Sequence, residues 1–234
     1  MKGKKIKIAG VLLVSTMLAV TSLAACGTKT TSKSTGSSGS TTTVSASDMF
    51  TKRDLDSGYD ESKATKIKLS DSKTIVSGDG AKFSSENGVN TVTITKEGTY
   101  ILSGKLNGHV VVDTDKTAKV QIVLKGATVS GKSTAAIYVK QADKVFLTLA
   151  PNSENTLTET GEFASDNSST VDGVIFSKDD LSINGTGLLK ISTESGHGVV
   201  SKDDLVIASG TIEIKSSGHG LQGKDSVRIA GGTI

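Results

Sequence analysis

One octapeptide pattern occurs three times in the last part of the chain. Its copies are Phe176–Ile183, Val200–Ile207 and Gln222–Ile229, which start 24 and then 22 residues apart. A second motif, Ser-Gly-His-Gly, occupies Ser195–Gly198 and Ser217–Gly220, again 22 residues apart. A fixed period of this length indicates stacked coils, because one repeat cannot bury its apolar residues alone and must pack on its neighbours.

The composition favours β-strands in these coils. Aromatic residues make up 3% of the chain, Trp is absent, and 26 Gly accompany a single Pro. Short strands joined by tight corners have this composition, whereas helical globular domains rarely do. Runs rich in β-branched residues predict further strands at 66–69, 91–95, 100–103, 110–113, 120–124, 137–139 and 145–149.

Aligning the repeats predicts which side chains point inward. Three apolar columns emerge: Leu181, Leu205 and Val227; Ile183, Ile207 and Ile229; and Leu189, Ile212 and Ile234. Alternate residues of a strand point to opposite faces, so the residues between these columns point outward, among them Lys190 and Glu213 on adjacent coils. Three strands per turn and 22–25 residues per coil predict an all-β fold, a right-handed parallel β-helix.

The boundaries of this solenoid can also be predicted. Residues 66–234 form the expected β-helix, and residues 47–65 form a helical cap over the first coil, with its helix beginning at Ser47 or Asp48. No capping segment follows Ile234, so we expect a fragment with further coils downstream. The coil from Val145 to Leu181 is oversized, and its surplus, 151–170, is either a functional excursion or a solvated loop.

The N-terminus predicts export. Residues 1–25 combine four lysines with a long apolar run, which is typical of a secretory signal peptide and also compatible with a transmembrane helix. Leu23-Ala-Ala-Cys26 resembles the bacterial lipobox, which implies lipidation of Cys26. Residues 26–46 then form a Ser/Thr-rich linker. The expected location is the bacterial cell surface, anchored by lipid to the outer face of the cytoplasmic membrane.

Charge excludes one class of partner. The chain has 27 basic and 24 acidic side chains, but four of the lysines lie in the signal peptide. The remaining 23 basic and 24 acidic groups are nearly balanced, so the basic excess gives no support for nucleic-acid binding. Cys26 is the only Cys, so an intramolecular disulfide is excluded.

Charged residues recur at the start of each coil. An aspartate lies two residues before each of four successive strands: Asp143, Asp179, Asp203 and Asp225. A lysine directly precedes three of these aspartates: Lys178, Lys202 and Lys224. Stacked like charges repel, so something must compensate them. Either the lysines neutralise the Asp column or Ca²⁺ is held between carboxylates of successive coils, and a charged sugar-binding face is compatible with both.

Two histidines share another column. His197 and His219 are each flanked by Gly, and Asp172 lies one coil earlier. Such residues either share a metal or hydrogen-bond the next coil at a corner. Gly-His-Gly and Asp-Asp also occur in polygalacturonases, but here the acids and histidines lie at different points around the coil, so no catalytic residue is assigned.

Several strings closely resemble a family of clostridial-type surface proteins, the carbohydrate-binding domain proteins. They are Met49–Leu55, Gly58–Asp60, Ala135–Leu149 and Ser153–Leu157, together with the Lys-Asp-Asp-Leu repeats. The resemblance covers about residues 48–234. It implies a polysaccharide-lyase-like right-handed β-helix that binds cellulose and polygalacturonate, carries Ca²⁺ and has no established catalysis. Many members have Asp-Gly-Ile at coil corners. At the matching corners of this chain, Asp172 is the only acidic residue, and His197 and His219 take the place of the other two.

The sequence therefore predicts a lipid-anchored, extracellular and non-catalytic protein that binds an acidic or plant cell-wall polysaccharide as a monomer. The candidate carbohydrate-binding residues are Lys178, Lys202, Lys224, His197 and His219, and the candidate Ca²⁺ ligands are Asp143, Asp172, Asp179, Asp203 and Asp225. The lack of Trp favours a charged or hydroxyl-bearing glycan over a flat crystalline one. A lyase or hydrolase acting on a uronate-containing glycan and a structural adhesin or spacer are the alternatives.

Overall fold

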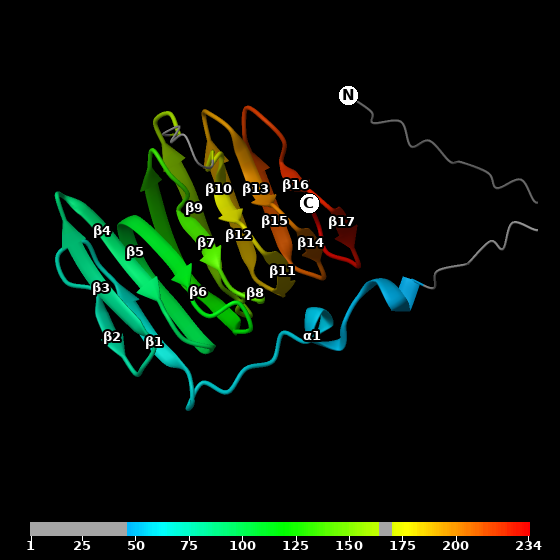
Figure 1. Cartoon of the computed structure of the whole chain (residues 1–234), viewed down its shortest axis with the longest axis horizontal. Helices are drawn as coiled ribbons and strands as arrows, with labels where there is room; N and C mark the ends of the chain where they lie inside the picture. The colour runs from blue at the N-terminus through cyan, green and yellow to red at the C-terminus, as the bar shows by residue number, and fades with distance from the viewer. Residues whose placement is uncertain (1–45, 164–169) are drawn as a thin grey trace, which may run out of the picture. The chain divides into compact units, whose positions relative to one another are not determined.

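A computed structural model describes residues 46–163 and 170–234, which form an all-β unit with two short helical segments (Figure 1). The expected signal peptide, Cys26 and residues 26–45 of the expected linker lie outside the described residues, as does Asp166 in the predicted excursion. Among the described residues, no helix has the length and apolar character that crossing a bilayer requires.

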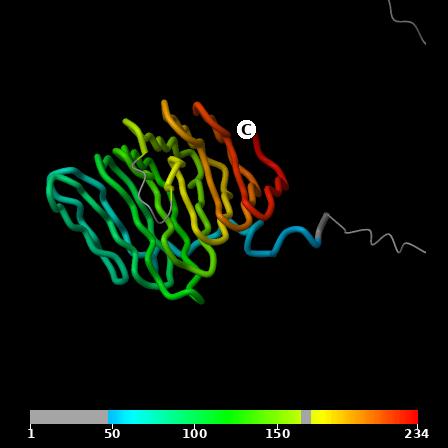
Figure 2. Tube along the Cα trace, turned by 45° about the horizontal axis from the view of Figure 1, so that its top comes forward, coloured from blue at the N-terminus to red at the C-terminus, as the bar shows by residue number. Residues whose placement is uncertain are grey.

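Parallel strands pair in three ladders, which the chain visits in turn; one such circuit is a coil (Figure 2). The first ladder contains β1 (Thr65–Leu69), parts of β5 (Gly98–Asp113) and β6 (Lys119–Lys132), β8 (Lys144–Leu149), β11 (Asp180–Gly185), β14 (Asp204–Ile207) and β17 (Ser226–Ile229). The second contains parts of β5 and β6, then β9 (Glu154–Thr160), β12 (Leu188–Thr193) and β15 (Thr211–Lys215). The third contains β4 (Val89–Ile94), the end of β5, β7 (Ile137–Gln141), β10 (Gly173–Ser177), β13 (His197–Ser201) and β16 (Leu221–Gly223). Together they make a nearly closed, barrel-like sheet of mostly parallel strands.

The predicted inner columns are confirmed by the register. Leu181 pairs with Leu205 and Leu205 with Val227, while Ile183, Ile207 and Ile229 pair in the same way. Leu189 pairs with Ile212, and Lys190 with Glu213. Leu181, Ile183 and Leu189 are at most 1% exposed, and burying each such side chain contributes about 1.5–3 kcal/mol to folding. The stacked aliphatic columns are therefore the core of the molecule up to the last coil, where Val227, Ile229 and Ile234 are 41%, 54% and 56% exposed.

All seven strands predicted upstream exist, but the predicted cap over the first coil is wrong. Strands β2 (Ile75–Ser77) and β3 (Ala81–Glu86) cover the first coil instead, pairing antiparallel with β1 and β4. The N-terminal helices, η1 (Ala46–Met49) and α1 (Lys52–Leu55), lie elsewhere. The N-cap of α1 is Thr51 rather than Ser47 or Asp48, because Thr51 and Asp54 form a reciprocal capping box.

Residues 49–61 form a strap across the outside of the first ladder. Their contacts run along the stack: Met49 O accepts from Arg228 Nη1 at 2.7 Å, Asp54 O from Asn184 Nδ2 at 3.1 Å, and Gly58 O from Gln121 Nε2 at 3.3 Å. At the end of the strap, Glu61 accepts from Lys125 Nζ at 3.0 Å. The segment runs along the side of the coils because their outer side chains satisfy its backbone carbonyl groups.

The predicted excursion is shorter than expected. Within 151–170, Glu154–Thr160 forms β9, which pairs with β6 and β12 and buries Leu157 completely. Glu154 forms an ion pair with Lys190, and Glu159 is buried. The sequence of this segment predicts a polar loop, because Leu157 is the only apolar residue of β9 and the inward residues on either side of it are Asn155 and Glu159. The surplus of this coil therefore lies after Thr160.

Candidate functional site

Three lysines form a file at the corner that follows the third ladder. Lys178, Lys202 and Lys224 each come directly after a strand of that ladder. Lys202 N donates to Ser177 O at 2.8 Å, and Lys224 N donates to Ser201 O at 3.0 Å, so the coils stay in register through the corner. Parallel rungs are about 4.8 Å apart. The lysine corner, as we call this file, therefore repeats a positive charge at the spacing of the coils.

The serine of the repeated motif holds this corner in shape. Ser177 and Ser201 are fully buried, and both hydroxyl groups donate to Asp179 O, at 2.6 and 3.0 Å. Ser201 Oγ also accepts from Asp203 N at 3.2 Å. These bonds fix the turn, which explains why the first two copies of the motif carry a serine directly before the lysine.

Aromatic rings lie beside the lysine ammonium groups. Lys202 Nζ is 5.1 Å from the centre of the Phe176 ring, and Lys178 Nζ is 5.9 Å from the Tyr138 ring. The two rings contact each other edge to face, with centres 5.8 Å apart. Both distances are within the range of cation–π attraction, which places each cation over a ring. The rings orient two of the lysines without neutralising them.

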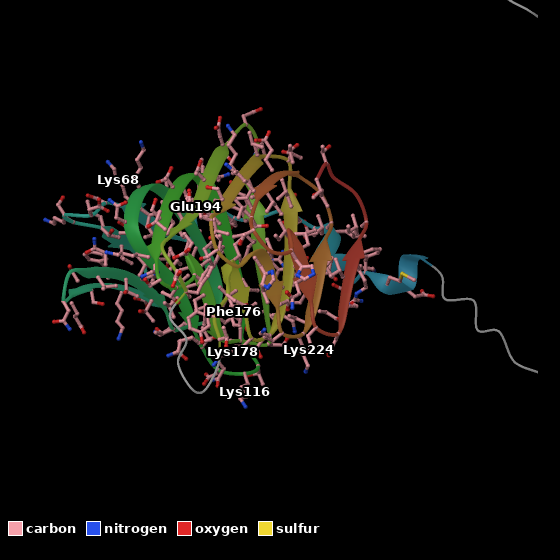
Figure 3. The ribbon with its side chains drawn as sticks, turned by 90° about the horizontal axis from the view of Figure 1, so that it is seen from above. Lys68, Lys116, Phe176, Lys178, Glu194 and Lys224 are labelled. Atoms are coloured by element: carbon pink, nitrogen blue, oxygen red, sulfur yellow. The ribbon has the colours of Figure 1, made fainter. Side chains whose placement is uncertain are left out.

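The lysine corner lines a shallow groove of about 480 Å³ together with Thr170 and Phe176. Figure 3 shows Phe176, Lys178 and Lys224 along one edge of the molecule. Lys178 and Lys224 are exposed and Lys202 is half-buried. Among the described residues, only Lys224 of the three has a carboxylate partner, Asp225, at 3.9 Å. The groove therefore presents positive charge that the described part of the chain leaves mostly unneutralised.

The members of the first Asp column have different surroundings. Asp143 pairs with Lys119 at 2.7 Å, and Asp179 Oδ2 accepts from Ala142 N at 3.0 Å. A hydrogen bond to the Asp225 carboxyl group, and then partial burial, raise the pKa of Asp203. In the described ranges, no three His, Cys, Asp or Glu side chains converge to hold a metal ion. Asp143 and Asp179 thus have individual partners, whereas Asp203 lies beside the carboxyl group of Asp225.

The second Asp of each motif faces the strap instead. Asp204 forms an ion pair with Arg228 and accepts from Ser226 Oγ at 2.7 Å. Asp180 lies 3.8 Å from Lys144 Nζ, and burial raises the pKa of Asp180 despite that cation. The prediction that the lysine column neutralises the aspartates is therefore wrong for most of the file. Apart from the Lys224–Asp225 pair, the cations beside the aspartates of these two columns are Lys119, Lys144 and Arg228, all on the first ladder.

The two histidines link successive coils. His219 N donates to His197 Nδ1 at 2.8 Å, and the ring centres are 5.0 Å apart. His197 Nε2 lies 3.8 Å from Asp172 Oδ2. A Cβ atom at Gly218 would lie 2.5 Å from His197 Nδ1, so the glycine beside the histidine is required for the close approach. This geometry is the structural corner role considered for the motif.

The buried polar network under the strap was not predicted. Gln121 Nε2 donates to Thr148 Oγ1 at 3.0 Å, and Thr148 Oγ1 donates to Asn184 Oδ1 at 2.7 Å, all three being at most 2% exposed. A signal was present in the sequence. Phe146 and Val206 occupy outward positions of the first ladder, where an uncovered face would carry polar residues.

Comparison with known proteins gives a consistent result. The family model of carbohydrate-binding domain-containing proteins matches residues 87–234. A carbohydrate-binding domain-containing protein of Acetivibrio thermocellus is 35% identical over 128 residues, which cover 53% of this chain and 45% of that protein. The chain thus spans less than half the length of this relative. A solved structure of a polysaccharide lyase-like protein from C. thermocellum, a gadolinium derivative, is 26% identical with a TM-score of 0.60 and covers 72% of this chain and 80% of that one.

Proposed function

The chain belongs to the carbohydrate-binding domain-containing protein family, and from this premise we propose that it binds an acidic polysaccharide at the lysine corner. The observation that carries the proposal is the file of Lys178, Lys202 and Lys224, which lines one groove and has a single carboxylate partner among the described residues. A linear polyuronate repeats carboxylates along its length. Such a polymer can place several of its charges against this file at once.

The proposal also covers the fold type, the lipid anchor and the two histidines. We propose that the three ladders are the faces of a right-handed parallel β-helix, supported by the pairing of each coil with the next. The lipobox-like Leu23–Cys26 supports secretion and lipid anchoring at Cys26, which would hold a monomeric, non-catalytic binding unit at the bacterial surface. His197 begins β13 and His219 precedes β16, so both lie at the opposite end of the third-ladder strands from the lysines, where they are proposed to border the glycan.

Affinity electrophoresis in gels that contain polygalacturonate tests the binding proposal. We expect retardation of the parent chain and about tenfold weaker binding for K178A/K202A/K224A, since each exposed ion pair contributes up to about 1 kcal/mol. The matched control is K68A/K82A/K105A, which removes the same charge from other faces. Equal loss in both variants would show that total charge, rather than this corner, causes binding.

The same experiment separates the alternatives. Xylan and cellulose gels test neutral glycans, and no retardation on any glycan would favour an adhesin or spacer. Accumulation of unsaturated uronides during incubation with polygalacturonate would favour a lyase. Calcium binding at Asp143, Asp172, Asp179, Asp203 and Asp225 stays a prediction. Repeating the gel with a chelator tests it, because binding that depends on Ca²⁺ is lost.

A further inference from the structure

The dipeptide Asn-Gly occurs three times in the chain, at Asn87–Gly88, Asn107–Gly108 and Asn184–Gly185. This dipeptide deamidates readily, because glycine has no side chain to keep its amide nitrogen away from the asparagine side chain. The reaction needs an asparagine side chain that is free to rotate, a glycine N–H group without a fixed partner, and access for water. The structure separates the three sites by these requirements.

The site at Asn184 meets none of them. Asn184 is fully buried, its Oδ1 accepts from Thr148 Oγ1 at 2.7 Å, and its Nδ2 donates to Asp54 O at 3.1 Å. Gly185 N donates to Ser209 Oγ at 2.9 Å. Both groups that would have to react are therefore held in other hydrogen bonds and shielded from solvent.

The site at Asn107 is exposed but held in place. Asn107 N and Nδ2 donate to the two carboxylate oxygens of Asp71, each at 2.5 Å. Gly108 is buried and pairs with Asn90 on the preceding coil, and a Cβ atom at Gly108 would lie 2.1 Å from Asn90 O. The Asp71 carboxylate thus keeps the side chain of Asn107 from turning toward Gly108.

The site at Asn87 lies at the tip of the cap hairpin (Ala81–Ile94), the β3–β4 pair at one end of the stack (Figure 1). Glu86 pairs with Val89, and the φ angles of 51° at Asn87 and 78° at Gly88 match a type I′ turn. Asn87 and Gly88 are exposed, and a Cβ atom at Gly88 would meet nothing within 4 Å. The tip is therefore open to water and unrestrained by packing.

We propose that Asn87 is a site of spontaneous deamidation in the folded protein, whereas Asn107 and Asn184 are protected. Gly88 N gives its proton to a solvent base and bonds to Asn87 Cγ. The Cγ–Nδ2 bond breaks, and the nitrogen takes up a proton and leaves as ammonia. Water then opens the succinimide ring. Breaking the new bond to Cγ gives aspartate, and breaking the original peptide bond gives isoaspartate. One water is consumed, one ammonia is released, and nothing is oxidised or reduced.

The modification changes the cap of the stack. Isoaspartate routes the backbone through the side chain and lengthens it by one carbon, so the two-residue turn between Glu86 and Val89 no longer fits. The cap hairpin shields apolar residues of the first coil, since Phe83 pairs with Val92, and Val92 and Ile94 are fully buried. Deamidation should therefore loosen the hairpin and free an edge of β4, which other strands can join.

Peptide mapping of the aged full chain tests the site. The folded protein is incubated at mildly alkaline pH and digested with trypsin, which places the three Asn-Gly sites in separate peptides, and deamidation is read by mass spectrometry against unincubated protein. We expect Asn87 to convert about tenfold faster than Asn107 or Asn184, which react only after a local opening of the coils. In urea the three should convert at similar rates. The proposal is overturned if the folded chain converts all three at similar rates, or if Asn87 stays intact for a time that converts all three in urea.

A variant that cannot deamidate tests the effect on the cap. Asn87→Gly removes the side-chain amide and keeps the turn, because glycine adopts positive φ without strain. After the same incubation, amide hydrogen exchange in 81–94 should be about tenfold faster in the parent and unchanged in Asn87→Gly. Equal exchange in the two aged proteins, despite conversion at Asn87 in the parent, would contradict the effect on the cap.

Discussion

At the scale of single residues, the buried serines of the repeat decide where the lysines point. Ser177 and Ser201 converge on one carbonyl group, Asp179 O, and this contact ties the corner of one coil to the corner of the next. In the third copy Gly223 takes the place of the serine, and the chain still pairs in register there. Lys178 and Lys202 therefore depend on hydroxyl groups that never meet solvent.

Ser201→Ala should destabilise the fold by about 1–2 kcal/mol. The substitution removes one donor to Asp179 O and leaves Asp203 N without its acceptor in a buried turn. Urea unfolding followed by circular dichroism measures the change. The matched control is Ser217→Ala, because Ser217 is exposed and its hydroxyl group makes one long bond, to Gly196 O at 3.4 Å, so its loss should cost less than about 0.5 kcal/mol. Equal effects of the two substitutions would contradict the role given to the buried serine.

At the scale of elements, the strap fastens the side of the stack. Asp54 is 1% exposed and lies 2.8 Å from Lys144 Nζ, and the backbone carbonyl groups of Asp54 and Asp56 both accept from Asn184. Burial alone would raise the pKa of Asp54, but hydrogen bonds from Lys144 and Thr51 outweigh burial and lower it. The ionised carboxylate is thus the form that holds the strap.

The attachment of the strap should weaken in acid. A lowered pKa means that the contribution of Asp54 is complete above the ordinary Asp pKa of about 3.9 and is lost as the pH falls through the folded-state value. Asp54→Asn should cost about 3 kcal/mol at pH 7, because Lys144 loses its buried partner. The difference should shrink toward pH 2.5 in denaturant titrations. A difference that is constant over this pH range would contradict the assignment.

The coils were predictable from the sequence, and the strap was not. Columns such as Leu181, Leu205 and Val227 follow from a repeat of almost constant length. A repeat of this kind allows the strands to pair in only one register. The strap instead depends on contacts between residues more than a hundred positions apart, such as Asp54 with Asn184. Of the candidate site, the lysine file was predictable because it repeats, whereas the ring positions of Tyr138 and Phe176 required the folded coil.

At the scale of the whole molecule, the three ladders carry different surfaces. The first is covered by the strap, the second carries mostly polar outward side chains, and the third ends at the lysine corner. A solenoid makes this separation possible because each position in a coil generates a file along the stack. Each side of the core can therefore carry a surface of its own charge and polarity.

Salt should weaken glycan binding at the lysine corner. Exposed charges are screened over about 8 Å at physiological ionic strength and about 3 Å at 1 M salt. Raising NaCl from 0.05 to 1 M should therefore weaken polygalacturonate binding severalfold, as measured by titration calorimetry. An affinity that does not change with salt would contradict binding through the lysine ammonium groups.

Lysine acetylation footprinting tests the central claim most directly. The protein is treated with a limiting acetylating reagent, with and without polygalacturonate, and modification at each lysine is read by mass spectrometry. We predict that the polymer protects Lys178, Lys202 and Lys224 and leaves Lys68 and Lys82 as reactive as before. Protection spread evenly over all lysines, or confined to Lys68 and Lys82, would contradict binding at the lysine corner.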